Sequence, residues 1–174
     1  MSTIIELLKA KRRQTGERLL KVVDDLSDLQ LGWRPAPRAH SIGFTLWHAA
    51  RADDNVQADL SERALEWVTG GYAKRWGHPE RGVGTGWEDE RSAALTLPPK
   101  AELLEYAGRV FHAVDAAVSA LDEVRLGEVV PSRFMSEPST RAEVLLVSLS
   151  HDNRHLGEME YIKGLLGLTG TVTT

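Results

Sequence analysis

The chain has 174 residues, which is enough for one domain with a hydrophobic core of its own. Hydrophobic residues make up 42% of the chain, and the formal net charge of −4 comes from acidic and basic residues mixed along it, so no basic block points to nucleic acid. The complete absence of cysteine excludes disulfides, zinc–thiolate sites and a catalytic cysteine.

The sequence carries no signal for a membrane or for export. No apolar run approaches the roughly 18–20 residues that a membrane-spanning helix needs. The first residues, 1–6, lack a basic start followed by an apolar core and do not read as a signal peptide. We therefore expect a cytoplasmic protein whose partner is a small molecule rather than nucleic acid or a membrane.

A first helix is predicted from Thr3 onward. Thr3 and Glu6 have the spacing of a capping box, in which each side chain bonds the backbone N–H of the other residue. Core-type residues then recur at helical intervals, with a gap at Lys11; they are Ile4, Leu8, Thr15, Leu19, Val22 and Leu26. Two prolines in the segment 32–37 cannot continue a helix and form a stiff connector.

Ser41 can cap a second helix, which the sequence predicts from Ile42 to about Val68, before a glycine pair. The segment 72–97 that follows has no clear period and combines four glycines with three aromatic residues, Tyr72, Trp76 and Trp87. A loop of this length inside a compact domain is usually functional or disordered, and its aromatic residues favour an ordered loop packed over another part of the molecule.

The second half of the chain predicts two further helices. Pro98–Pro99 stands where a helix can begin, because proline costs least in the first turn, and an apolar stripe follows. Thr140 and Glu143 form another capping box and open a helix that runs to about Leu166. No convincing strand pattern appears. The prediction is a single all-α domain, residues 1–174, built as a four-helix bundle with a long loop between helices 2 and 3.

A pair of histidines lies on the predicted fourth helix. His151 and His155 are four residues apart, so both imidazoles project from one face with Cβ atoms about 5–6 Å apart. They interrupt a stripe that otherwise faces the core, formed by Val144, Val147, Ser148, Glu158 and Ile162. Two buried neutral histidines need partners, and one shared metal ion would satisfy both. The alternative is that they are polar residues at the margin of the stripe.

His48 lies midway along the predicted second helix, and one helix of a bundle can easily face another across the core. Together with the pair it would give three nitrogen ligands and one open position. That arrangement is typical of catalytic sites, since a structural zinc is usually closed by four protein ligands. Taken alone, His48 reads as a hydrogen-bonded core histidine.

Two segments resemble the DinB-like (YfiT-like) superfamily. One is SIGFTLWHAAR, residues 41–51, with the preceding Trp-Arg-Pro connector; the other is HDNRHLGE, residues 151–158, followed by Leu-Leu-Gly. The resemblance implies an up-down-down-up four-helix bundle, a homodimer, and a divalent transition metal, zinc or nickel, bound by His48, His151 and His155. Two departures leave this triad intact: Leu156 and Glu158 stand where the superfamily frequently has Arg and Gln.

Other polar residues near the triad have more than one interpretation. Glu158, one turn from the second histidine of the pair, could be a fourth ligand, a partner of a ligand, a general base or a solvated carboxylate. Arg51 could bind an anionic substrate or pair with a nearby carboxylate. His78 could cover the metal or lie exposed on the loop. Asp53 and Asp54 are expected on the surface or beside a ligand.

An open three-histidine site suits two chemistries. It can lower the pKa of a bound water to about 7 and act as a hydrolase, or hold an external thiol as the reactive thiolate. Characterised DinB-like relatives include enzymes that use bacillithiol or mycothiol. The resemblance therefore favours a metal-dependent transferase that uses a low-molecular-weight thiol on a small electrophilic substrate. The alternatives are a metal-dependent hydrolase and a non-catalytic metal- or ligand-binding stress protein, because fold membership does not decide function.

Overall fold

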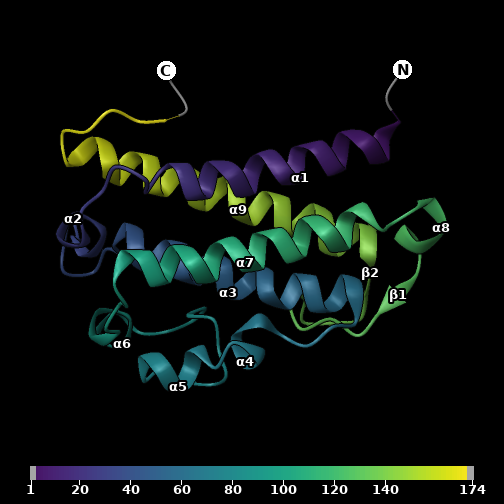
Figure 1. Cartoon of the computed structure of the whole chain (residues 1–174), viewed down its shortest axis with the longest axis horizontal. Coiled ribbons are helices and arrows are strands. Elements are labelled where there is room, and N and C mark those ends of the chain that lie inside the picture. Colours follow the sequence, from purple (N-terminus) through teal and green to yellow (C-terminus); the bar gives the residue numbers. More distant parts are fainter. Residues whose placement is uncertain (1–2, 172–174) are drawn as a thin grey trace.

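Four long helices dominate the computed structural model, which describes residues 3–171 (Figure 1). The helices are α1 (Ile4–Lys21), α3 (Ile42–Ser61), α7 (Lys100–Ser119) and α9 (Arg141–Leu165). The predicted all-α four-helix bundle is therefore confirmed. Residues 1, 2 and 172–174, which the single-domain prediction includes, lie outside the described part of the chain.

Three of the long helices, α1, α3 and α9, begin where the sequence predicts, because polar side chains at their N-caps satisfy first-turn N–H groups. Both capping boxes are formed, by Thr3 with Glu6 at α1 and by Thr140 with Glu143 at α9. Ser41 accepts the N–H of the residue three positions on and so caps α3.

Two helices end earlier than predicted. α1 stops at Lys21, so Val22 and Leu26 of the predicted apolar pattern lie in the turn that leads to a short helix, α2 (Asp28–Gly32). α3 stops at Ser61 instead of continuing to about Val68, because Glu62 adopts a left-handed backbone with φ of 61°. The predicted continuation forms a separate helix, α4 (Glu66–Thr69). Asp54 on α3 accepts the N–H groups of Glu66 and Trp67, which gives the chain an alternative to one long helix.

The long helices follow the up-down-down-up order that the resemblance implies. In Figure 1, α3 and α7 run in the same direction, while α1 and α9 run in the opposite one. Parallel neighbours need a long crossover, and the segment between α3 and α7 supplies it. The part predicted to have no regular structure, residues 72–97, contains two short helices, α5 (Tyr72–Trp76) and α6 (Asp89–Ala94).

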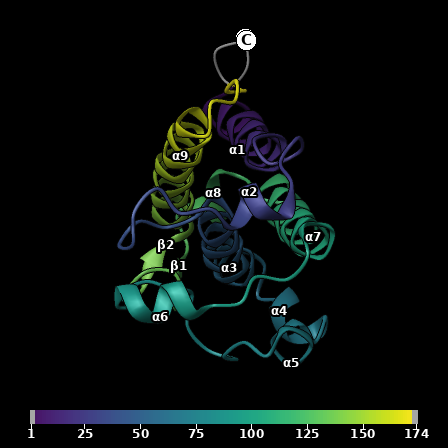
Figure 2. The same ribbon diagram turned by 90° about the vertical axis from the view of Figure 1, so that its left-hand side faces the viewer.

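The arrangement of the bundle brings α3 and α9 together. α3 packs against α7 and α9, and α1 packs against the same two helices, so α1 and α3 occupy opposite corners (Figure 2). Apolar side chains from all four helices fill the space between them. Any group that extends from α1 to α3 must therefore cross the centre of the bundle.

The connection between α7 and α9 contains a feature that the sequence analysis does not predict. After the short helix α8 (Glu123–Leu126), the strands β1 (Val129–Val130) and β2 (Ser139–Thr140) pair antiparallel. Two residues per strand are too few for an alternating pattern to be recognised. Within residues 3–171, no helix is both long enough and apolar enough to cross a membrane.

Candidate metal centre

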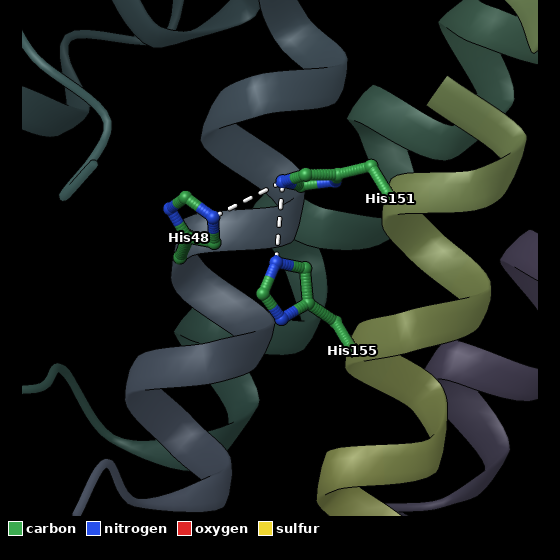
Figure 3. A group of neighbouring side chains, drawn as sticks. All are labelled: His48, His151 and His155. Carbon is green, nitrogen blue, oxygen red and sulfur yellow. Dashed lines mark hydrogen bonds between the residues drawn. The ribbon is translucent and has the colours of Figure 1, made fainter. Parts of the chain in front are cut away.

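Three histidines come together where α3 and α9 face each other (Figure 3). The Nε2 atom of His151 lies 3.1 Å from that of His48 and 3.2 Å from that of His155. Each ring offers one nitrogen, and all three nitrogens lie within 4.8 Å of one another. The side chains predicted to share a metal are thus neighbours, and this group could hold an ion.

The Nδ1 atom of each ring faces an oxygen on the side away from the other histidines. The partner of His48 is the backbone carbonyl of Val83, at 2.6 Å. His151 faces Oδ1 of Asp152 at 3.1 Å, and His155 faces Oε2 of Glu158 at 2.6 Å. Carbonyl and carboxylate oxygens only accept hydrogen bonds, so in a neutral ring the proton belongs on Nδ1. The Nε2 atoms are then unprotonated.

Three unprotonated nitrogens that face one another suit a cation. Zinc–nitrogen bonds of about 2.0–2.1 Å would separate tetrahedral ligand nitrogens by about 3.3–3.4 Å, close to the spacing of these Nε2 atoms. Burial also lowers the pKa of His48 to about 4, so this ring is neutral at pH 7. A guanidinium N–H of Arg154 lies 3.3 Å from Nε2 of His155, which fits an unprotonated nitrogen there. The residues therefore fit a divalent metal.

The histidines open into a pocket of about 390 Å³. Aromatic walls come from three different parts of the chain, namely Phe44 on α3, Trp87 on the crossover and Phe134 before β2. Within the described chain, Glu158 is the one carboxylate among the residues that line this pocket. The crossover thus forms part of the pocket wall, which agrees with the predicted ordered loop packed over another part of the molecule.

Gly84 lets the crossover backbone approach the histidines closely. Its φ of +94° is rarely adopted by residues with a side chain, and a Cβ atom there would lie 3.1 Å from both Phe44 and Trp47 and 3.5 Å from Nδ1 of His48. This close approach is what brings the preceding Val83 carbonyl within hydrogen-bonding distance of His48.

The sequence pattern of the DinB superfamily matches residues 12–159, which is most of the chain. The chain belongs to the DinB superfamily. No curated protein matches the chain significantly.

Solved structures share the fold of this DinB chain. A conserved protein from Enterococcus faecalis has a TM-score of 0.81 at 18% identity, with 96% of this chain and 99% of that chain covered. YfiT from Bacillus subtilis is described as a probable metal-dependent hydrolase with an unusual four-helix bundle topology. It has a TM-score of 0.65 at 14% identity, with 97% of this chain and 91% of that chain covered. A DinB-like protein from Bacillus cereus has a TM-score of 0.62 at 18% identity, with 90% of this chain and 88% of that chain covered.

A buried charged network lies behind the histidines of the DinB chain. Arg12 on α1 donates to both Asp53 on α3 and Asp152 on α9, and all three side chains are almost completely buried. Burial alone would raise the pKa of Asp152, but Arg12 and His151 outweigh it and hold that pKa below its ordinary value. The pKa of Asp53 is raised, mainly by burial. The expectation that Asp53 lies on the surface or beside a ligand is therefore wrong: its side chain is buried and bonds Arg12.

The remaining candidates take structural positions in the DinB chain. Glu158 bonds the outer nitrogen of His155, so it is a partner of that ring. Arg51 lies over Trp67, 3.7 Å from a carboxylate oxygen of Asp54, and donates to carbonyls of the crossover. The expectation of an exposed His78 is wrong: its ring is buried, with Nε2 2.7 Å from the carbonyl of Thr96, because the aromatic side chains of the crossover pack around it.

Two groups near the metal centre escape the sequence analysis. The gap at Lys11 in the apolar stripe of the first helix is the only signal of Arg12, which occupies the inward position there. Asp152 directly follows His151 in the sequence, but adjacency alone does not predict the hydrogen bond between the two side chains. An aspartate that follows a helical histidine usually points in another direction.

Proposed function

We propose that the chain is a metal-dependent enzyme that binds one divalent transition metal, zinc or nickel, through Nε2 of His48, His151 and His155. We further propose that it transfers a low-molecular-weight thiol to a small electrophilic substrate. The observation that carries the proposal is the set of three Nε2 atoms that face one another at the wall of a pocket of about 390 Å³. Three protein ligands leave a metal position for a further molecule.

A metal in such a site lowers the pKa of the water or thiol that binds it. The residues of the pocket support activation by the metal rather than by a side-chain base. Glu158, the one carboxylate lining the pocket among residues 3–171, already accepts from His155. Phe44, Trp87 and Phe134 would hold the apolar part of a substrate and exclude water.

A second candidate function is metal-dependent hydrolysis. The observation that favours it is the likeness in fold to YfiT, which is described as a probable metal-dependent hydrolase. At 14% identity this likeness concerns the fold, so hydrolysis comes to this chain as an alternative proposal. A thiol transferase and a hydrolase differ in one readily measured requirement, which is the thiol.

The test begins with zinc and nickel titrations of the metal-free protein, followed by elemental analysis. The loaded protein is then incubated with monochlorobimane and each of several thiols, and separately with chromogenic esters in the absence of thiol. We expect one metal per chain and thiol-dependent loss of the bimane reagent, both absent in His155→Ala. Hydrolysis without thiol would favour the second candidate. A loaded protein inactive in both assays would overturn the enzyme proposal and favour a binding protein.

A further inference from the structure

The inference concerns the buried network of Arg12, Asp53 and Asp152. The guanidinium donates one hydrogen bond to Oδ2 of each aspartate, and the three side chains are at most 2% exposed. Asp152 uses its second oxygen, Oδ1, to accept from Nδ1 of His151. A continuous line of hydrogen bonds therefore runs from α1, through α9, to one of the proposed metal ligands.

Stability is a weak explanation for such a network. Three charged groups lose their hydration in the centre of the bundle, and apolar residues of similar volume often stabilise a protein as well or better. One oxygen of Asp53, Oδ1, has no hydrogen-bond partner among the described residues, which adds to the cost. The position of the network beside His151 gives it a more specific role.

The three histidines differ in how their outer nitrogens are held. His48 bonds a neutral backbone carbonyl, and His155 bonds Glu158, whose side chain is 47% exposed. The acceptor of His151 is a fully buried carboxylate that is itself held by an arginine from another helix. A buried charged acceptor orients a ring and raises the basicity of its other nitrogen more than a neutral or solvated one.

We propose that Asp152 is a positioning residue for His151 and that Arg12 holds Asp152 in place. Asp152 keeps the imidazole in the tautomer that leaves Nε2 free for the metal. Arg12 holds Asp152 from α1 across the centre of the bundle, and its second bond, to Asp53 on α3, keeps the guanidinium itself in position. This inference rests on the proposed metal centre, because it assigns a role toward the same metal.

The chain offers a matched pair of variants for the test. Asp152→Asn and Asp53→Asn each remove one buried carboxylate from Arg12 and leave it paired with the other. Of these two aspartates, Asp152 is the one that accepts a hydrogen bond from His151. An asparagine at 152 can turn its NH₂ group toward Nδ1 of His151, which would favour the wrong tautomer.

Two readouts separate positioning from structure. ¹⁵N NMR of the metal-free protein reports the tautomer of His151, and zinc titration reports affinity. In Asp152→Asn we expect the Nε2–H tautomer to gain population and zinc affinity to fall about 10–100-fold. In Asp53→Asn we expect the wild-type tautomer and an affinity close to that of the wild type. Thermal unfolding of both variants checks that they lose comparable stability.

Equal behaviour of the two variants would overturn the proposal, as would a wild-type His151 tautomer in Asp152→Asn. If Asp152→Asn does not fold, the same measurements are made on Arg12→Lys, which keeps the charge but cannot bond both carboxylates with a planar fork. An unchanged His151 in that variant would also contradict the role. Failure of the wild type to bind zinc or nickel would overturn the proposed metal binding. The tautomer measurement needs no metal, so it tests the effect of Asp152 on His151 separately.

Discussion

Removing one imidazole from the metal centre is expected to abolish tight metal binding. In His48→Ala or His155→Ala only two nitrogens remain, and loss of a ligand should cost more than the roughly 100-fold that loss of a ligand's hydrogen-bond partner can cost. Titration with zinc and elemental analysis measure the effect. His112→Ala, which removes an exposed histidine from α7, is the control. Unchanged stoichiometry and affinity in both triad variants would contradict the assignment.

The metal-free protein is expected to lose stability in mild acid because of His48. Burial lowers the pKa of this ring from 6.5 to about 4, so between these values the unfolded chain binds a proton that the folded chain does not. The contribution to the free energy of unfolding is fully present above pH 6.5 and is lost as the pH falls toward 4, by about 3 kcal/mol at most. Urea denaturation across this range measures it. His48→Gln should show a smaller loss, and identical pH profiles would refute the explanation.

The sequence predicts which histidines come together but not the groups that orient their rings. Four residues are little more than one helical turn, so a shared face for His151 and His155 follows from spacing alone. The Val83 carbonyl belongs to a stretch without period, where no spacing says which backbone atom meets which ring. Arg12 lies 140 residues from Asp152, and only the diagonal packing of the bundle brings them together.

At the scale of the elements, local signals predict where helices begin better than where they end. The capping boxes at Thr3 and Thr140 bring two complementary side chains within four residues, so they can be recognised from sequence. The end of α3 depends instead on Asp54, which lies in the middle of the helix and bonds the backbone of α4. Such a tertiary bond overrides the helical preference of the residues between them.

The crossover is expected to contribute to ligand binding through Trp87. This side chain lines the pocket. The guanidinium carbon of Arg91 lies 4.1 Å from the centre of the Trp87 ring. Trp87→Ala should raise KM for a pocket-bound substrate about tenfold, or ~1.4 kcal/mol, because one apolar wall is lost. Metal content should not change, since the three proposed ligands are all histidines and remain in place. Steady-state kinetics and elemental analysis on the same preparation test both statements.

Trp33→Ala provides the comparison for that variant. Trp33 is a partly exposed tryptophan on the connector before α3 and is not among the residues that line the pocket. Both substitutions remove the same number of atoms, so a shared fall in melting temperature reports lost packing alone. A folded Trp87→Ala protein with unchanged KM would show that Trp87 packs the crossover and does not touch the substrate.

For the whole molecule, the topology explains why the pocket has walls from such distant segments. Because α3 and α7 run parallel, the chain must return along the bundle between them (Figure 1). The backbone of this return reaches His48 on α3 through the carbonyl of Val83. A bundle with short loops between antiparallel neighbours would leave that face of α3 open. The crossover that the topology requires is also the segment that completes the site.

We predict that two chains associate through α9. Apolar side chains on its outer side are unusually exposed for a helix in a bundle, with Tyr161 70%, Leu146 52% and Leu165 49% exposed. Light scattering at micromolar concentration should give twice the mass of one chain. Tyr161→Glu should shift the mass to that of one chain, because a charge would be buried at the interface. Val124→Glu, an exposed apolar position on α8, should not, and a monomeric wild type would contradict the prediction.

The hydrogen bond between His48 and the Val83 carbonyl would couple the crossover to the proposed metal. If the crossover moved away from α3, His48 would lose the acceptor that holds its tautomer and would bind a metal less tightly. Thermodynamic linkage would make this coupling reciprocal: a bound metal would favour the observed position of the crossover by the same factor by which that position favours the metal. A molecule that holds Gly84 and Trp87 in place would then slow the loss of the metal without touching it, so a filled pocket and a retained ion would accompany each other.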